Sequence, residues 1–205
     1  MPRPRSEDRR GAILSAATRV IAAQGLGATT AAIAKEAGVS NGSLFVYFDT
    51  KTTLFNELYV ALKTEMGAAA IAGLPAGKEP REQVRHLWAQ WSHWATANPR
   101  KRRALAQLDV ADGVTAQSHR QASAALGGIA ELIDRSRAGG PMEAVPLGFV
   151  LALISAMAEA AIDAMIREPG EAEARSRVAF EAVWQVLSGE PTRATPPSNG
   201  PTPPR

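Results

Sequence analysis

Cysteine is absent from this 205-residue chain, and histidine occurs only three times. Without cysteine the chain has no disulfide framework, no thiol nucleophile and no thiolate metal site, and a reducing cytoplasm is its natural compartment. His86 and His93 would lie roughly 10 Å apart along a helix, so they cannot bind one metal ion together. His119 stands alone, and a surface histidine is its simplest interpretation.

Other arrangements that serve catalysis are also missing. The sequence contains no His-Glu-x-x-His spacing, phosphate-binding loop or dinucleotide fingerprint. Glu159 and Asp163 form an i, i+4 carboxylate pair, but the Glu-x-x-His motifs that accompany such pairs in di-metal bundles are absent. Ser155 has no base near it in the sequence. We therefore expect no enzymatic activity, no metal site and no cofactor.

Excess charge is small, at +3, but it is unevenly placed. Residues 1–54 hold seven Lys and Arg against four Asp and Glu, whereas residues 55–205 hold sixteen of each kind. A positive excess at one end fits a nucleic-acid partner. The longest apolar run, Leu147 to Ala158, is shorter than the ~20 residues that span a bilayer, and the N-terminus lacks a signal-peptide pattern. We expect a cytoplasmic protein with no membrane partner.

Residues 29–51 carry the most informative local pattern. Apolar residues recur there in two sets at helical spacing: Ile33, Ala34 and Ala37 before Gly38, then Leu44, Val46 and Phe48 after Ser40. Gly38 supplies the left-handed backbone of a tight turn, and Ser40 is a good N-cap for the second helix. This is a helix-turn-helix, the unit that lays its second helix in the DNA major groove. A plain helical hairpin in a core is the alternative, but it would not gather Ser, Asn, Gly and Ser in one turn.

At these residues the chain resembles the tetracycline-repressor (TetR) family of bacterial transcriptional regulators. The resemblance is carried by TTAAIAKEAGVS, by GSLFVYF, by Lys51 and by the amphipathic helix before them, and it covers roughly residues 8–62. It implies an all-α protein, with an N-terminal three-helix helix-turn-helix DNA-binding unit and a C-terminal helical domain for ligand binding and dimerisation. It also implies DNA contacts from Thr29, Thr30, Ser40, Asn41, Gly42, Ser43, Phe45, Tyr47 and Lys51. Because the family usually has Tyr where this chain has Phe45, a phosphate hydrogen bond is lost there and packing remains.

Composition divides the chain into four parts. Residues 1–6 form a basic arm expected to be disordered, 7–50 the DNA-binding unit, 51–187 the effector-binding and dimerisation domain, and 188–205 a proline-rich tail expected to be disordered. A long helix from Lys51 through Leu62 would join the two units rigidly. The basic run Arg100–Arg103 is interpreted as a solvated face, and residues 115–137 as one helix.

Three of the four tryptophans lie within seven residues of a helix predicted over residues 80–98. They are either core or the wall of a cavity for a bulky apolar ligand. Under the second interpretation the pocket consists of Trp88, Trp91, Trp94, Met157, Glu159 and Asp163, and the two carboxylates face a cationic group. They could equally stabilise an interface network.

Two final helices, residues 146–167 and 171–187, have more apolar surface than one small domain can bury. Their small residues allow close packing, so we expect a homodimer interface at Ala152, Ser155, Val178, Ala179, Ala182 and Val186. The sequence thus predicts a homodimeric transcriptional regulator that binds a double-stranded, palindromic operator. It is expected to be a repressor released by a small, largely apolar effector. The alternatives are a ligand-independent DNA-binding regulator and a helical small-molecule-binding protein without DNA function.

Overall fold

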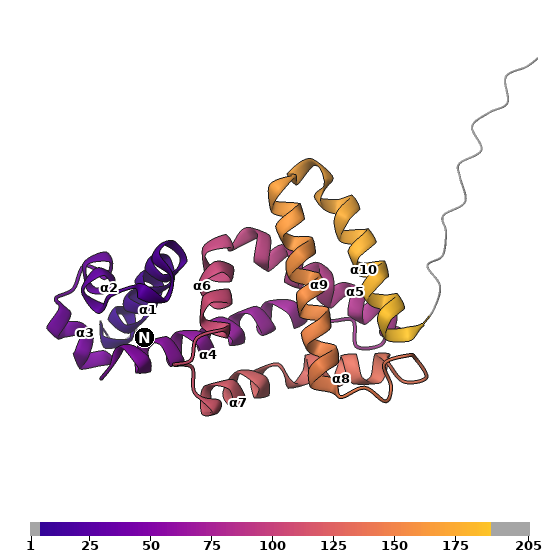
Figure 1. Ribbon diagram of the computed structural model, residues 1–205, viewed down its shortest axis with the longest axis horizontal. Helices are drawn as coiled ribbons and strands as arrows, with labels where there is room; N and C mark the ends of the chain where they lie inside the picture. Colours follow the sequence, from indigo (N-terminus) through magenta and orange to yellow (C-terminus); the bar gives the residue numbers. More distant parts are fainter. Residues whose placement is uncertain (1–4, 190–205) are drawn as a thin grey trace, which may run out of the picture.

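The computed structural model describes residues 5–189, and over that range it contains helices and no strand. The elements in order are α1 (Arg5–Gln24), η1 (Gly25–Gly27), α2 (Thr30–Ala37), α3 (Asn41–Tyr47), α4 (Lys51–Ile71), α5 (Pro80–Ala97), α6 (Pro99–Asp109), α7 (Ala116–Ala125), α8 (Gly127–Ser136), α9 (Leu147–Arg167), η2 (Pro169–Glu171) and α10 (Ala172–Ser188). Figure 1 shows α1–α3 grouped at one end of an elongated molecule, with the later helices at the other. The prediction of an all-α fold is confirmed.

The N-terminal unit is a three-helix bundle around a small apolar core. α1 turns Ile13, Ala17 and Ile21 inward, and all three are fully buried. They pack with Ile33 of α2 and Leu44 of α3, which are also fully buried. Two ion pairs hold α1 from outside the core: Arg19 binds Glu36 of α2 at 2.5 Å, and Arg10 binds Glu57 of α4. The shared core fixes the position of α3, while the two exposed ion pairs join α1 to α2 and to α4.

The link between α1 and α2 is tightened by a single turn of 3₁₀ helix, η1. Gly25 adopts a left-handed φ of 68°, which a residue with a Cβ rarely takes. The turn closes with the Ala28 N–H donating to the Gly25 carbonyl. α2 then begins at Thr30, because the Thr29 side chain accepts a hydrogen bond from the Ala32 N–H and caps the helix.

α4 belongs to both halves of the molecule. Its first turns bury Leu54, Phe55 and Leu58, and its later turns bury Leu62 and Ala70 among the helices of the C-terminal domain. Figure 1 shows it running from the α1–α3 end into the middle of the larger domain, where α5 packs along it. A 21-residue helix of this kind is about 30 Å long, so one continuous element runs from the N-terminal unit into the larger domain.

The larger domain comprises the rest of α4 together with α5 to α10. α5 lies against α4, α8, α9 and α10, and α9 and α10 form an antiparallel pair at the outer edge. α6 differs from the others because it packs along α1 and so contacts the N-terminal unit as well as α4 and α5. Two helices, α4 and α6, therefore bridge the two units.

Several predicted boundaries change. The predicted helix over residues 115–137 is wrong as one element, since it is split into α7 and α8 around Leu126, just before Gly127 and Gly128. α1 already begins at Arg5, inside the predicted arm, and α10 extends to Ser188, inside the predicted tail. The remainder of both predicted segments, residues 1–4 and 190–205, lies outside the described residues.

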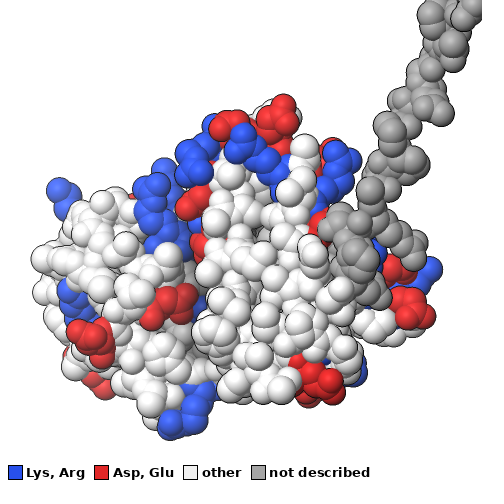
Figure 2. All heavy atoms as spheres, turned by 45° about the vertical axis from the view of Figure 1, so that its right-hand side comes forward, with Lys and Arg blue, Asp and Glu red and all other residues white. Residues whose placement is uncertain are grey.

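α9 is, within residues 5–189, the one helix that is long and apolar enough to cross a membrane by length and composition alone. It packs here against α5, α8 and α10, yet only 28% of its most apolar window is buried. Phe149 on this helix is 57% exposed, and Val178 on α10 is 72% exposed. Figure 2 shows a broad face with few charged side chains over these two helices. The chain alone therefore leaves an apolar face uncovered.

Candidate DNA-binding surface and effector cavity

The turn between α2 and α3 has the geometry that the sequence predicts. Gly38 closes α2 in a left-handed conformation, φ 68° and ψ 30°, and its N–H donates to the carbonyls of Ala34 and Lys35. Ser40 then caps α3, its Oγ accepting from the Ser43 N–H at 3.1 Å and donating to the Ser43 Oγ at 2.9 Å. Ser40 and Ser43 are therefore engaged with each other in setting the start of α3.

α3 has one buried side and one exposed side. Leu44 is fully buried on the inner side, and so is Phe48 just past the helix end. The outer side carries the exposed residues Asn41, Gly42, Phe45 and Val46. Val46 is 79% exposed, so its grouping with Leu44 and Phe48 in the sequence pattern is wrong. Side chains that could enter a groove thus project from one continuous strip of α3.

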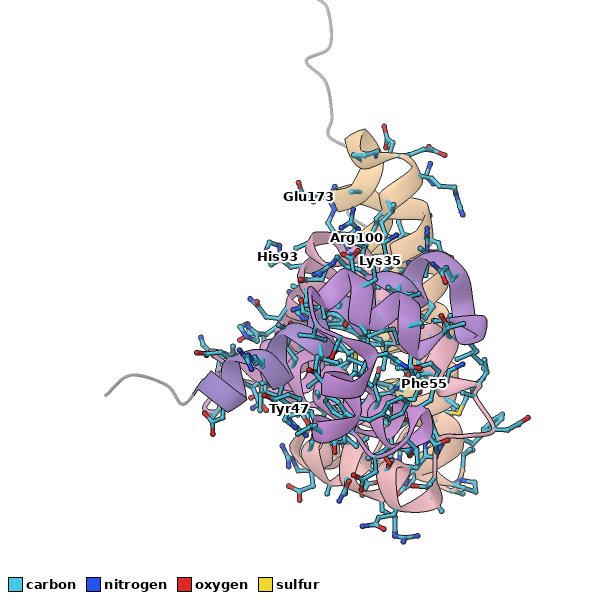
Figure 3. The ribbon with its side chains drawn as sticks, turned by 90° about the vertical axis from the view of Figure 1, so that its left-hand side faces the viewer. Lys35, Tyr47, Phe55, His93, Arg100 and Glu173 are labelled. Atoms are coloured by element: carbon cyan, nitrogen blue, oxygen red, sulfur yellow. The ribbon has the colours of Figure 1, made fainter. Side chains whose placement is uncertain are left out.

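The remaining predicted DNA-contact residues surround this strip. Thr29 is exposed and Thr30 partly buried at the start of α2, while Ser43 and Tyr47 are partly buried on the flank of α3. Tyr47 lies on the end of the molecule that faces the viewer in Figure 3. The predicted residues therefore lie on α2 and α3, at the N-caps of these two helices, and at the first residue of α4.

Lys51 has a contact that the sequence did not suggest. Its Nζ donates to the Leu26 carbonyl at 2.9 Å and lies 5.0 Å from the centre of the Phe55 ring. Lys51 therefore joins the start of α4 to the η1 turn, 25 residues earlier in the chain. An ammonium has three N–H donors, so this bond leaves others that can reach a phosphate.

A cavity of about 400 Å³ lies in the larger domain, within the usual range for small-molecule sites. It is enclosed by α4, α5, α6, α7, α8 and α9. Its lining is mostly apolar and includes Met66, Leu87, Trp91, Trp94, Leu105, Leu126, Ile129, Ile133, Leu151 and Ile154. Gly67 of α4 approaches Leu126, one of the lining residues, so closely that a Cβ on Gly67 would lie 2.5 Å from the Leu126 side chain. The α7–α8 break thus packs directly on α4 beside the cavity.

Charged groups in the cavity wall are already paired. Lys63 of α4 binds Asp109 of α6 at 3.0 Å, and Arg102 of α6 binds Glu159 of α9 at 2.7 Å. Ser123 and Ser155 supply hydroxyls to the lining. The wall therefore offers two cations and two anions in matched pairs, together with neutral hydrogen-bonding groups.

Arg102 makes the most extensive of these contacts. Its guanidinium bonds to the Glu159 carboxylate and carbonyl, and Nη1 lies 2.7 Å from Asp163. Burial opposes its charge, but the hydrogen bonds that it donates to Glu159 and Asp163 outweigh that effect, so the pKa of Arg102 is raised. The interpretation of Arg100–Arg103 as a wholly solvated face is thus wrong for Arg102, whose side chain is only 15% exposed. Its place three residues before the buried Leu105 was the available signal.

The six residues proposed for the pocket separate into two groups. Trp91, Trp94 and Glu159 line the cavity, whereas Trp88, Met157 and Asp163 are not among its lining residues. Trp88 faces α10 and donates from its indole nitrogen to the Ser176 Oγ at 2.9 Å. Trp94, although it reaches the cavity, also donates to Glu65 at 3.0 Å. The tryptophan helix is therefore partly core and partly cavity wall.

His119 is exposed, as expected for a surface histidine, but it is not isolated. Its Nδ1 lies 3.0 Å from the Tyr59 hydroxyl, and the two rings meet edge to face at 5.1 Å. Burial, and then the charge and hydrogen bonding of Asp109, raise the pKa of Tyr59. This tyrosine therefore stays neutral and holds α7 against α4. Within residues 5–189, no group of three or more His, Asp or Glu side chains is placed to hold a metal ion.

The residues proposed for the dimer interface lie on the outer α9–α10 pair. Ala152, Ser155 and Val178 are exposed, and Ala179, Ala182 and Val186 are partly buried. Ser155 also reaches the cavity lining, so the cavity and the uncovered face are close together on α9.

Comparison with known proteins connects these features to a family. The sequence model of the family described as bacterial regulatory proteins, tetR family, matches residues 13–58, which run from α1 into α4. A tetR-family transcription regulator from Shewanella sp. PV-4 is 28% identical, with a TM-score of 0.80 over 87% of this chain and 97% of that one. One from Marinobacter aquaeolei VT8 is 21% identical, with a TM-score of 0.76 over 91% and 98%.

A third relative was solved with a ligand. The TetR-like transcriptional regulator LfrR from Mycobacterium smegmatis, in complex with proflavine, is 17% identical and has a TM-score of 0.64. The similarity covers 89% of this chain and 99% of that one. The likeness to these structures therefore extends over the N-terminal unit and the larger helical domain together.

Proposed function

The chain is a member of the TetR family of bacterial regulatory proteins, and on that premise we propose that it is a homodimeric transcriptional repressor released from its operator by a small effector. The observation that carries the proposal is the strip of α3. It projects from a rigid three-helix unit at the end of the chain where the positive charge excess lies. A core helix would not leave Asn41, Phe45 and Val46 uncovered together.

The individual roles follow from side-chain chemistry. Asn41, Ser43 and Thr30 have hydrogen-bonding groups suited to base edges in the major groove. Tyr47 and Lys51 flank them and are suited to phosphates, as is the backbone of Gly42, where no side chain stands in the way. Contacts to phosphate fix the register of the helix, and contacts to bases supply the sequence preference.

The second part of the proposal is a two-fold dimer through α9 and α10. Phe149 and Val178 expose apolar surface there, and Ala152 and Ala182 allow another pair of helices to approach closely. A four-helix contact across a two-fold axis buries the face that one chain leaves open. It also presents two copies of α3 to successive major grooves, about 34–36 Å apart.

The third part concerns the effector, for which the cavity is the proposed site. An ionic ligand would have to break the Lys63–Asp109 or the Arg102–Glu159 pair, at a cost in desolvation. A neutral, largely apolar molecule would instead contact Trp91 and Trp94 and bond to a serine hydroxyl. The paired charges therefore favour an uncharged effector over the cationic one considered from sequence.

Coupling to DNA would pass through α4 and α6, since both line the cavity and both contact the N-terminal unit. An effector that binds the DNA-free arrangement a hundredfold better than the DNA-bound one supplies about 2.7 kcal/mol of coupling. That is enough to empty an operator on which the two states are otherwise balanced.

Selection of duplexes from a randomised pool tests the DNA-binding function. Purified protein should enrich one family of sequences, and these should contain an inverted repeat. A protein that binds small molecules without any DNA function would enrich nothing. A ligand-independent regulator would enrich an operator, but none of a set of neutral and charged aromatic compounds would release it from that operator.

A further inference from the structure

Val46 is the most exposed of the large hydrophobic side chains in the described part of the protein, at 79% of its surface. It follows the fully buried Leu44 by two positions, which is about 200° around a helix. Val46 therefore points almost directly away from the core of the N-terminal unit. A β-branched residue is also a weaker helix former than most, so neither packing nor helix propensity accounts for valine at this position.

The surroundings of Val46 leave it in a prominent position. Gly42 lies one turn earlier on the same strip, and a Cβ there would meet only the Ser40 Oγ, at 4.0 Å. Phe45, next to Val46, is 40% exposed. Because Gly42 has no side chain, the backbone of α3 can come close to another molecule at that point. Val46 and Phe45 would then be the apolar side chains that contact this molecule.

The proposed function puts this strip in a major groove, and the present inference rests on it. Every polar group on a base edge would lose its water against a valine without gaining a hydrogen bond. One group in the major groove suits valine, the C5-methyl of thymine. We propose that Val46 reads a thymine in each half-site by packing its methyl groups on the thymine methyl, with Phe45 covering the flank of the same contact.

This assignment gives α3 two kinds of readout. Asn41, one turn before Phe45, can make paired hydrogen bonds to an adenine. Val46 adds an apolar contact that distinguishes thymine from cytosine and also from uracil, which lacks only the methyl group. The uracil comparison isolates the proposed contact, because base pairing and all other groove atoms are unchanged.

The experiment uses the operator obtained by selection and replaces each thymine of a half-site with uracil, one at a time, symmetrically in both halves. Wild-type protein should lose affinity at one position, by about fourfold for each methyl lost and roughly 15-fold for the symmetric pair. Val46→Ala should bind the thymine and uracil duplexes alike at that position. Val110→Ala is the matched control, since Val110 is 76% exposed in the loop after α6 and should keep the full thymine preference.

A failure of the inference about Val46 can be told apart from a failure of the proposed DNA-binding function. If wild-type protein binds the operator tightly and no uracil substitution matters, or if Val46→Ala keeps the preference, the inference about Val46 is refuted and the DNA-binding function stands. An operator without thymine within reach of α3 has the same consequence. If selection yields no operator, both the inference and the proposed function are refuted.

Discussion

Arg102 and its two carboxylates should behave asymmetrically when either side is removed. The Arg102 side chain is 15% exposed, whereas those of Glu159 and Asp163 are 42% and 53% exposed. Arg102→Met leaves two carboxylates that water can reach. The double replacement Glu159→Ala with Asp163→Ala leaves a mostly buried guanidinium without an anionic partner. The second change should therefore cost more stability than the first, although both remove the same two ion pairs.

The burial of each side chain sets the expected loss in the free energy of unfolding. Two half-exposed ion pairs contribute about 0.5–1 kcal/mol each, so Arg102→Met should lower the free energy of unfolding by about 1–2 kcal/mol. Stranding a buried charge costs about 3–5 kcal/mol, and the remaining exposure of Arg102 puts the expected value near the lower limit. The triple variant should lose roughly 2–3 kcal/mol less than the sum of the two, because it strands no charge.

Urea unfolding followed by circular dichroism, at one fixed protein concentration, measures these differences. Arg103→Met is the matched control, since Arg103 is the exposed neighbour and its replacement should change stability by no more than about 0.5 kcal/mol. Equal effects of the Arg102 and Arg103 variants would refute the reasoning. So would strictly additive losses in the triple variant, because they would mean that no interaction couples the three side chains.

Three further predictions concern the dimer, the phosphate contact and the cavity. Val178→Arg should give folded monomers with weak operator binding, whereas Val110→Arg, at a similarly exposed position, should remain dimeric. If sedimentation shows that Val178→Arg is still a dimer, the interface does not lie at Val178. Lys51→Ala should weaken binding to all sequences alike and lower the salt slope by about one for each protomer, and a changed base preference with an unchanged slope would contradict the phosphate role. Neutral acridine, at slightly alkaline pH, should quench tryptophan fluorescence more than cationic proflavine does, and Trp91→Phe should reduce that quenching to the part that comes from Trp94. Equal quenching of wild type and variant would place the ligand outside the cavity.

The helix-turn-helix could be predicted from sequence because its determinants are local. Gly38 sets the turn, and Ser40 caps α3 by accepting a hydrogen bond from the Ser43 N–H, three positions later. Leu44 faces the core at helical spacing. None of these depends on a distant segment. Val46 shows the limit of such local patterns, since the apolar pattern groups it with Leu44 and Phe48 although its helical position lies opposite Leu44.

The cavity could be predicted only in part because its walls come from distant segments. Arg102 meets Glu159 across 57 positions, and Lys63 meets Asp109 across 46, so no short-range pattern connects either pair. The helical stripe on α5 groups Trp88 with Trp91, but α10 covers Trp88 and leaves Trp91 beside the cavity. Which side of a helix becomes core and which becomes cavity depends on the neighbours that the fold supplies.

The claim that two copies of α3 read one duplex across a two-fold axis can be tested by changing the spacing of the half-sites. Inserting about half a helical turn, roughly five base pairs, at the centre of the selected operator puts one half-site on the opposite face of the duplex. Affinity should then fall to the value of a single isolated half-site. Unchanged affinity for the lengthened operator would contradict the two-fold reading of one duplex by two copies of α3.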